Sequence, residues 1–228
     1  MSLGEFFVTM WEIFAKYWRT FLITGLSGTL LLSLITVFFG AMLGALLAMG
    51  KMSRIKPLTW IVTALIEVIR GTPLLLQLYI GYFMIPMLLP FWKISDFATI
   101  SIALVLNSGA YVSEVIRSGI QAVDKGQTEA ARSLGLGAKT TMISVVLPQA
   151  IKNILPALAN EFVTVIKETS LASTFFVGEL MTSYQIVKGA TFSSLPTLMI
   201  VGVIYFVITF ILSKVIGVFE RRLKHERA

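Results

Sequence analysis

The sequence contains no cysteine and only one histidine, His225. The first absence excludes disulfide bonds and cysteine-based zinc or redox sites, and a lone histidine cannot build a histidine-rich metal cluster. Charge is also scarce, because Asp, Glu, Lys and Arg make up 14% of the 228 residues whereas hydrophobic residues make up 56%. This balance, with a mean hydropathy of +0.85, excludes an ordinary soluble domain and predicts an integral membrane protein.

Five apolar segments are long enough to cross a bilayer, which requires about 20 residues per helix. The second and fourth exceed the length of one crossing and contain polar residues, so we expect each to be kinked, tilted or extended beyond the bilayer. The sequence therefore predicts an all-α integral membrane fold in one domain over residues 1–228. The five segments are Phe21 to Met49, Leu58 to Leu89, Phe97 to Ile120, Leu147 to Phe176 and Leu195 to Val218.

Basic residues are distributed unequally between the two sides of these segments. Eleven Lys and Arg lie after the first and third segments and in the C-terminal tail, against four in the N-terminal segment and the other two connections. The positive-inside rule then predicts an external N-terminus and a cytoplasmic C-terminus. We attribute the net charge of +7 to the basic residues that orient the chain in the membrane, and we therefore expect no nucleic-acid partner.

Residues 1–20 do not resemble a cleaved signal, because Glu5 and Glu12 stand where a basic region is expected and no cleavage site follows a short apolar run. Seven aromatic residues from Phe6 to Phe21 alternate with charges instead. This composition predicts a helix lying in the outer membrane interface, with a simple extension of the first span as the alternative.

The connection between the third and fourth segments is long enough to hold helices of its own. Asp124 can cap a short helix, with Gln127 as its capping-box partner. The helix is expected from Thr128 to Leu134, with Gly135 ending it in the left-handed conformation. A second helical piece is expected from about Ala138 to the start of the fourth segment.

The same connection carries residues at fixed spacing: Glu129-Ala130-Ala131, then Gly135, Val145 and Leu147-Pro148. This pattern resembles the EAA loop of permease subunits of bacterial ABC importers, in which isoleucine is usual at the position of Val145. The five-span layout, the Arg70-Gly71-Thr72-Pro73 element and the basic tail are similar to the polar amino acid uptake branch of these permeases. The resemblance implies a type I ABC importer-like fold in which residues 121–146 form a cytoplasmic coupling loop. It also implies docking of an ATPase subunit through Glu129, Ala130, Ala131, Gly135 and Leu136.

The resemblance further implies the transmembrane subunit of an ATP-driven amino acid importer in the bacterial cytoplasmic membrane. Its expected partners are an ATP-binding cassette ATPase, an external substrate-binding protein and a second permease chain, either identical or homologous. We expect the chain itself to be no enzyme and to hold no cofactor or metal. Gly135 to Thr140 lacks the spacing of a phosphate-binding loop and follows no predicted strand, so ATP and Mg would be bound by the ATPase.

Ionisable residues inside apolar segments are costly, and each is therefore a candidate functional residue. Two acid–base pairs stand three residues apart and share a helix face, so each pair could simply neutralise itself. Four carboxylates against three bases leave one excess negative charge, which a substrate of charge +1 would balance. The seven residues are Glu67, Arg70, Glu114, Arg117, Glu161, Lys167 and Glu168.

Irregular backbone is expected at mid-membrane, where it can line a cavity. Gly71, Thr72 and Pro73 predict a break in the second segment, and Pro156 predicts another in the fourth, near Glu161. We expect an amino acid to bind there with its carboxylate toward Arg117 and its side chain toward Glu161, which favours arginine, lysine or histidine. Further hydrogen-bonding groups come from Gln77, Asn107, Ser108, Tyr111 and Ser113.

Two other functions are considered beside this one. A secondary transporter driven by protons or sodium through Glu114 or Glu161 would lose uptake with the ion gradient, and such proteins usually have more spans and inverted repeats. A non-transporting scaffold would have no use for buried Glu and Arg on three segments. Reconstitution with and without an ATPase would separate the three functions.

Overall fold

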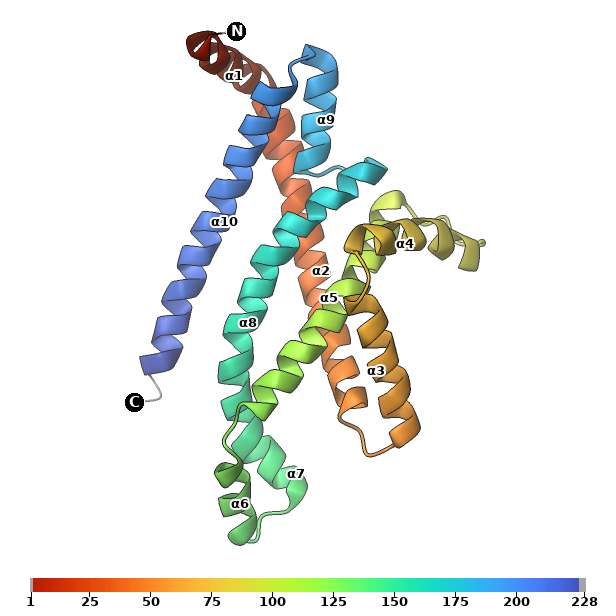
Figure 1. Ribbon diagram of the computed structural model, residues 1–228, viewed down its shortest axis with the longest axis vertical. Helices are drawn as coiled ribbons and strands as arrows, with labels where there is room; N and C mark the ends of the chain where they lie inside the picture. Colours follow the sequence, from red (N-terminus) through yellow and green to blue (C-terminus); the bar gives the residue numbers. More distant parts are fainter. Residues whose placement is uncertain (1, 226–228) are drawn as a thin grey trace.

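The computed structural model describes residues 2–225, and within this range the chain consists of helices and connecting loops without a strand (Figure 1). The predicted all-α fold is confirmed. The helices, in chain order, are α1 (Leu3–Trp18), the π-helix η1 (Arg19–Leu26), α2 (Ser27–Lys51), α3 (Lys56–Arg70), α4 (Leu74–Leu88), α5 (Asp96–Gln121), α6 (Lys125–Ser133), α7 (Ala138–Thr141), the π-helix η2 (Met142–Val146), α8 (Leu147–Glu168), the 3₁₀-helix η3 (Thr169–Phe175), α9 (Leu180–Thr191) and α10 (Ser194–His225).

Four stretches of the described chain are long and apolar enough to cross a bilayer, and a fifth is a broken pair. The pair consists of α3 and α4, which are bent by 111° across Gly71–Pro73, as the sequence predicts. The fourth predicted segment is also extended, because α7 and η2 precede α8 and η3 follows it. The continuous stretches are Leu3–Lys51, Asp96–Gln121, Ala138–Phe175 and Ser194–Arg221.

The predicted interruption at Pro156 is wrong, because α8 runs without a break from Leu147 to Glu168 with this proline inside it. Proline removes a single N–H from the helix, and helices in apolar surroundings tolerate it where neighbouring groups compensate. The second span differs because Pro73 follows Gly71 and Thr72 and becomes the N-cap of a new helix. Of the two helix breaks expected at mid-membrane, only the one between α3 and α4 is present.

The first helix is continuous in sequence with the first span but inclined to it (Figure 1). Ser2 and Glu5 form a capping box: Glu5 N–H donates to Ser2 Oγ over 3.3 Å, and Ser2 N–H donates to Glu5 Oε2 over 2.7 Å. Tyr17 departs from helical geometry (φ −114°, ψ 15°) and marks the end of α1. The interfacial position of α1 stays a prediction.

Helix α5 is the centre of the structure and packs against α2, α3, α4 and α8. Its contact with α2 is tight because small residues form the buried stripe of α2, in the manner of small-xxx-small packing in membranes. At Gly44 an added Cβ would lie 2.6 Å from Val112 Cγ1 on α5, so only glycine permits this approach. The stripe consists of Thr29, Ser33, Thr36, Gly40, Gly44 and Ala48, with Leu32 beside it.

A buried carboxylate organises the end of the molecule that holds α1 and α9. Glu179 is 0% exposed and caps α9 by accepting from Met181 N–H (2.7 Å) and Thr182 N–H (2.6 Å). It also accepts from Thr182 Oγ1 (3.1 Å) and from Tyr205 Oη on α10 (3.0 Å). Burial raises the pKa of Glu179 above its ordinary value, and these four donors oppose the rise in part. Glu179 is not among the candidate residues predicted from the sequence, because it lies outside the five apolar segments.

Candidate functional site

The break between α3 and α4 is held open by one glutamine side chain. Gln77 Nε2 donates to Ile69 O over 2.6 Å, to Thr72 O over 3.0 Å and to Thr72 Oγ1 over 2.9 Å. Pro73 has no N–H with which to satisfy Ile69 O, so the glutamine amide takes the place of the missing helical donor. Gln77 therefore stabilises the break, and its donors are used within the chain.

Helix α5 connects this break to Glu161 on α8. Asn107 Nδ2 donates to Gln77 Oε1 over 2.8 Å, and Asn107 is 3% exposed. The next residue, Ser108, is 1% exposed, and the Glu161 carboxyl group approaches its hydroxyl without completing a hydrogen bond of good geometry. Two consecutive residues of α5 thus lie between the broken helix and this carboxyl group.

Glu161 and Glu168 on α8 differ from Glu67 and Glu114 in their ionic partners. Among the described residues no Lys or Arg nitrogen lies within 4.0 Å of the carboxylate oxygens of either α8 residue, and both residues are half-buried. Of the two, Glu161 is the one that approaches Ser108 on α5. The first turn of α4 adds a complementary group, because its N-cap is Pro73 and the backbone N–H groups of a first turn have no intrahelical acceptor. The arrangement brings a carboxylate and a helix N-terminus to one region around α5.

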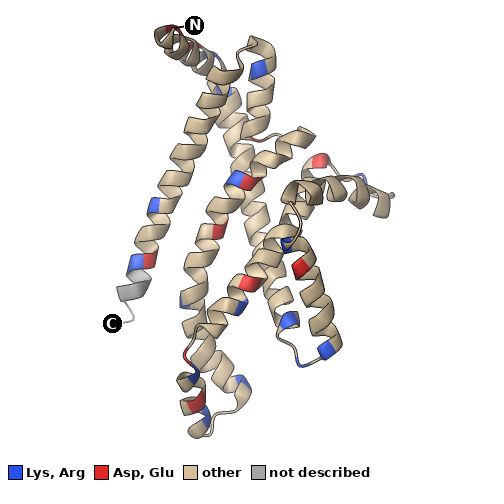
Figure 2. Cartoon of the chain, viewed as in Figure 1, with Lys and Arg blue, Asp and Glu red and all other residues tan. Residues whose placement is uncertain are grey.

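A separate ionic cluster lies where α2, α3 and α5 meet, and Figure 2 shows acidic and basic positions of these helices gathered in the same part of the molecule. Glu114 is its centre: Lys51 Nζ lies 2.5 Å from Oε1, Arg117 Nη2 2.8 Å from Oε2 and Arg70 Nη1 4.0 Å from Oε2. Glu67 Oε1 lies 3.8 Å from Lys51 Nζ. The five groups carry one excess positive charge.

The cluster alters two sequence predictions. Glu114 and Arg117 pair with each other as expected, but Glu67 pairs with Lys51 and Arg70 with Glu114, so the first acid–base pair does not neutralise itself. Lys51 was missed, because it stands in a basic stretch after the first span and nothing in the spacing distinguishes it from its neighbours. Lys152 on α8 was not counted either, and with both lysines the spans hold four acids and five bases, so the excess negative charge derived from counting is wrong.

Arg117 is poorly placed to hold a substrate carboxylate. Its Nε and Nη2 donate to Glu114 Oε2 over 2.9 and 2.8 Å, and its Nη1 donates to Gln121 over 2.6 Å. Two other expected ligands are also used within the chain. Ser113 is 0% exposed and donates to Ala110 O over 2.7 Å, and the ring of Tyr111 carries the Arg70 guanidinium at 5.5 Å.

The coupling loop contains the two short helices that were predicted, α6 and α7. Asp124 caps α6 by accepting from Gly126 N–H over 2.6 Å, which confirms the cap. The predicted capping box is wrong, because the Gln127 side chain contacts Gln149 at 3.4 Å instead of the Asp124 backbone. Gly135 has φ +84°, which confirms the left-handed end of the helix.

Two backbone hydrogen bonds complete the turn after α6. Gly135 N–H donates to Arg132 O over 3.0 Å and Leu136 N–H donates to Ala131 O over 3.1 Å, which is a Schellman motif. Glu129, Ala130 and Gly135 are exposed and Leu136 is half-buried, so these residues are open to a partner. Ala131 is 5% exposed and packs inside the chain, which corrects its predicted place on the docking surface.

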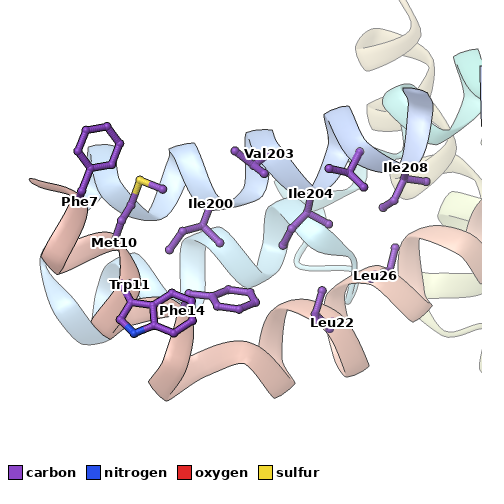
Figure 3. A pocket seen from close by; sticks show the side chains of 11 residues that line it. Phe7, Met10, Trp11, Phe14, Leu22, Leu26, Ile200, Val203, Ile204 and Ile208 are labelled. Carbon is purple, nitrogen blue, oxygen red and sulfur yellow. The ribbon is translucent and has the colours of Figure 1, made fainter. Parts of the chain in front are cut away.

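A largely apolar hollow of about 520 Å³ lies between α10 and the helices α1 and η1 (Figure 3). The labelled side chains of Phe14 and Leu22 approach those of Ile200, Ile204 and Ile208 across it. The one polar side-chain group in its lining is the indole N–H of Trp11, which cannot pair with both charged ends of an amino acid. The hollow is therefore no candidate for a polar substrate site, in contrast to the region around Asn107.

Comparison with known proteins yields a consistent set of relatives. Residues 40–225 match the family model described as binding-protein-dependent transport system inner membrane component. The chain is 43% identical over 204 residues to the arginine transport system permease protein ArtQ of Bacillus subtilis (strain 168), covering 90% of this chain and 93% of that protein. It is 37% identical to the L-cystine transport system permease protein TcyB of the same organism, covering 93% of this chain and 91% of that protein.

A solved structure shares the fold along nearly the whole chain. It is the crystal structure of an amino acid ABC transporter with histidines, which is similar with a TM-score of 0.86 and 44% sequence identity, covering 91% of this chain and 96% of that chain. The type I ABC importer-like architecture expected from the EAA pattern is confirmed by this likeness. The relatives are named for different amino acids, so relatedness does not select the substrate.

Proposed function

The chain belongs to the family of binding-protein-dependent transport system inner membrane components, as a permease of amino acid ABC transporters, and on this premise we propose that it carries cationic amino acids. Members of the family are permease subunits and are not themselves enzymes. The proposed system is completed by an ABC ATPase that binds ATP and Mg, a second permease chain and an external substrate-binding protein. The proposed orientation has the N-terminus outside and the C-terminus in the cytoplasm.

The observation that carries the substrate proposal is the unpaired carboxyl group of Glu161. A half-buried carboxylate among apolar segments is costly without a cationic partner, and a substrate ammonium or guanidinium group would supply that partner. The substrate carboxylate is proposed to face the N-terminus of α4, where free N–H groups and the helix dipole favour an anion. The N-terminus of α4 takes the role that the sequence assigned to Arg117, because the guanidinium group of Arg117 already donates to Glu114 and Gln121.

Energy is proposed to enter through the coupling loop, at the exposed residues Glu129, Ala130 and Gly135 and the half-buried Leu136. Helix α6 packs on η2, which continues into α8, and α5 packs along α8. Movement of α6 by the ATPase would thereby displace α8 and α5 together. Because Glu161 lies on α8 and Asn107 on α5, this displacement would change the walls of the proposed substrate site.

The test is transport by the permease reconstituted with its ATPase, comparing arginine with glutamine. Glu161→Gln should raise the KM for arginine about 10- to 150-fold, the equivalent of losing one charged hydrogen bond, while glutamine uptake is largely kept. Glu168→Gln is the matched control on the same helix, and it should change both substrates little. An unchanged ratio of arginine to glutamine uptake in Glu161→Gln would refute the assignment.

A further inference from the structure

A second hollow, of about 690 Å³, lies at the foot of α5 beside the coupling loop. Its walls come from the last turn of α5, from one face of α6, and from α7 with η2. Two cations, Lys125 and Arg132, line it from α6, seven residues apart and hence on the same helix face. Glu129 stands four residues after Lys125 and three before Arg132, so the hollow borders the exposed surface that is proposed to dock the ATPase.

The two cations have no anionic partner among the described residues, since no carboxylate oxygen lies within 4.0 Å of either. Arg132 Nη1 donates a hydrogen bond to Leu136 O over 3.3 Å, which leaves the other N–H groups of this guanidinium available. Asp124, the acid next to Lys125 in the sequence, accepts from Gly126 N–H at the N-terminus of α6. The hollow therefore has two positive charges that form no ion pair within the described part of the chain, although Glu129 borders the same helix face.

An unsatisfied hydroxyl group is the second, independent sign of a ligand. Thr141 lines the same hollow and is 2% exposed, yet its Oγ1 has no hydrogen-bond partner among the described residues. Buried hydroxyl groups in native structures are nearly always bonded. Thr141 Oγ1 is inaccessible to solvent as the side chain now stands, so a rotation about χ1 would be needed to turn the hydroxyl toward a ligand. An oxygen that accepts from the turned hydroxyl and faces Lys125 and Arg132 would satisfy all three groups, and such an oxygen belongs to an anion.

We propose that this hollow binds the phosphate group of an anionic phospholipid from the cytoplasmic leaflet. The hollow lies where α5 ends at Gln121 and just before α8 begins at Leu147, at the predicted boundary between bilayer and cytoplasm. The part of its wall that adjoins the membrane spans is apolar and consists of Ile120, Met142 and Val146. These side chains suit the glycerol and first acyl carbons of a lipid. Basic pockets between transmembrane helices on the cytoplasmic side are a recognised form of lipid site.

A bound phospholipid would hold α6 against the foot of α5. A free phosphate ion would fill only the polar part of the hollow and leave its apolar walls uncovered. The proposal does not depend on the identity of the transported amino acid, because the hollow shares no residue with the region around Glu161.

The test measures lipid binding by native mass spectrometry on the full-length chain in detergent. The chain is titrated with short-chain phosphatidylglycerol, with phosphatidylcholine and with inorganic phosphate. We expect one tight phosphatidylglycerol site and no comparable site for the other two. Lys125→Gln/Arg132→Gln should weaken it about 25-fold, taking about fivefold for each cation. Lys139→Gln, a basic residue of α7 that does not line the hollow, is the matched control and should leave binding unchanged.

Thr141→Val tests the site without changing charge. It should weaken phosphatidylglycerol binding severalfold, and assembly with the ATPase checks that each variant is folded. Equal binding of both lipids, or equal loss in Lys139→Gln and the double variant, would overturn the proposal. Displacement by inorganic phosphate would assign the hollow to a soluble anion instead. The lipid site could also disappear when the ATPase docks, with the double variant docking more weakly. That pair of results would assign the hollow to an acidic side chain of the ATPase.

Discussion

The hydrogen bond between Asn107 and Gln77 is expected to couple α5 to the broken span. Gln77→Leu removes the donor to Ile69 O and Thr72 and also leaves the Asn107 amide without its acceptor. Asn107→Leu leaves only Gln77 Oε1 without a partner. A buried polar group left unpaired costs about 1–3 kcal/mol. Gln77→Leu should therefore destabilise the chain by about 2–3 kcal/mol, and Asn107→Leu by about 1 kcal/mol.

The size of the coupling follows from the medium. Interhelical hydrogen bonds in membranes average about 0.6 kcal/mol and reach about 1.7 kcal/mol, because unfolded helices find other partners in the bilayer. A double-mutant cycle on Gln77→Leu and Asn107→Leu should therefore give a coupling energy in that range. Unfolding free energies from denaturant titration in bicelles supply the four corners of the cycle.

Ser101→Ala provides the matched control for this cycle. Ser101 is also on α5, but its hydroxyl donates to Phe97 O within the same helix over 2.7 Å. Its effect should add to that of Gln77→Leu within about 0.3 kcal/mol. The reasoning is refuted if the Asn107–Gln77 coupling is equally small, or if Asn107→Leu costs as much as Gln77→Leu.

Three further predictions concern the packing of α2 on α5, the coupling loop and the buried acid Glu179. Gly44→Ala should cost about 1–3 kcal/mol in unfolding free energy by overpacking α2 against α5, whereas Gly202→Ala, with open space around it, should be neutral or stabilising. Ala131→Glu should reduce folded yield before it affects ATPase docking, and Ala130→Glu should do the reverse, as measured by thermal unfolding and co-purification. The raised pKa of Glu179 gives stability that is fully present below about pH 4.3 and is lost as pH rises through the raised value. Glu179→Gln should abolish this part of the pH dependence of the unfolding temperature, and parallel curves for the two proteins would contradict it.

Much of the fold follows from local sequence signals. The five segments, the break at Gly71–Pro73 and the two loop helices follow from hydropathy, proline chemistry and capping residues, all of which act within a few positions. Gly135 belongs to the same group, since a left-handed helix end favours a residue without a side chain. These predictions succeed because neighbouring residues decide the outcome.

The errors concern contacts between distant residues. Lys51 and Glu114 are far apart in the sequence, and their 2.5 Å contact depends on how α2 and α5 cross. Gln127 fits a capping box locally, but a contact with Gln149 on α8 replaces it. Pro156 fails as a breaker because tertiary packing supports α8 on both sides of it. Each of these outcomes is decided by tertiary structure, which spacing along the chain does not encode.

The charge argument for a cationic substrate survives in a different form. Counted over the spans, the addition of Lys51 and Lys152 removes the negative excess on which the sequence prediction rested. The structure divides these charges into two groups, however, and the α2–α3–α5 cluster contains three bases and two acids. The other charged residues of the spans, Lys152, Glu161, Lys167 and Glu168, all lie on α8 and sum to zero. Lys152 stands nine residues before Glu161 and Lys167 six residues after it, so about 9 Å or more along the helix axis separates either base from this acid. Because charges interact strongly only at short range in a screened medium, Glu161 is the charge that a substrate bound beside it meets. A cation is therefore favoured beside Glu161 although the spans as a whole carry no negative excess.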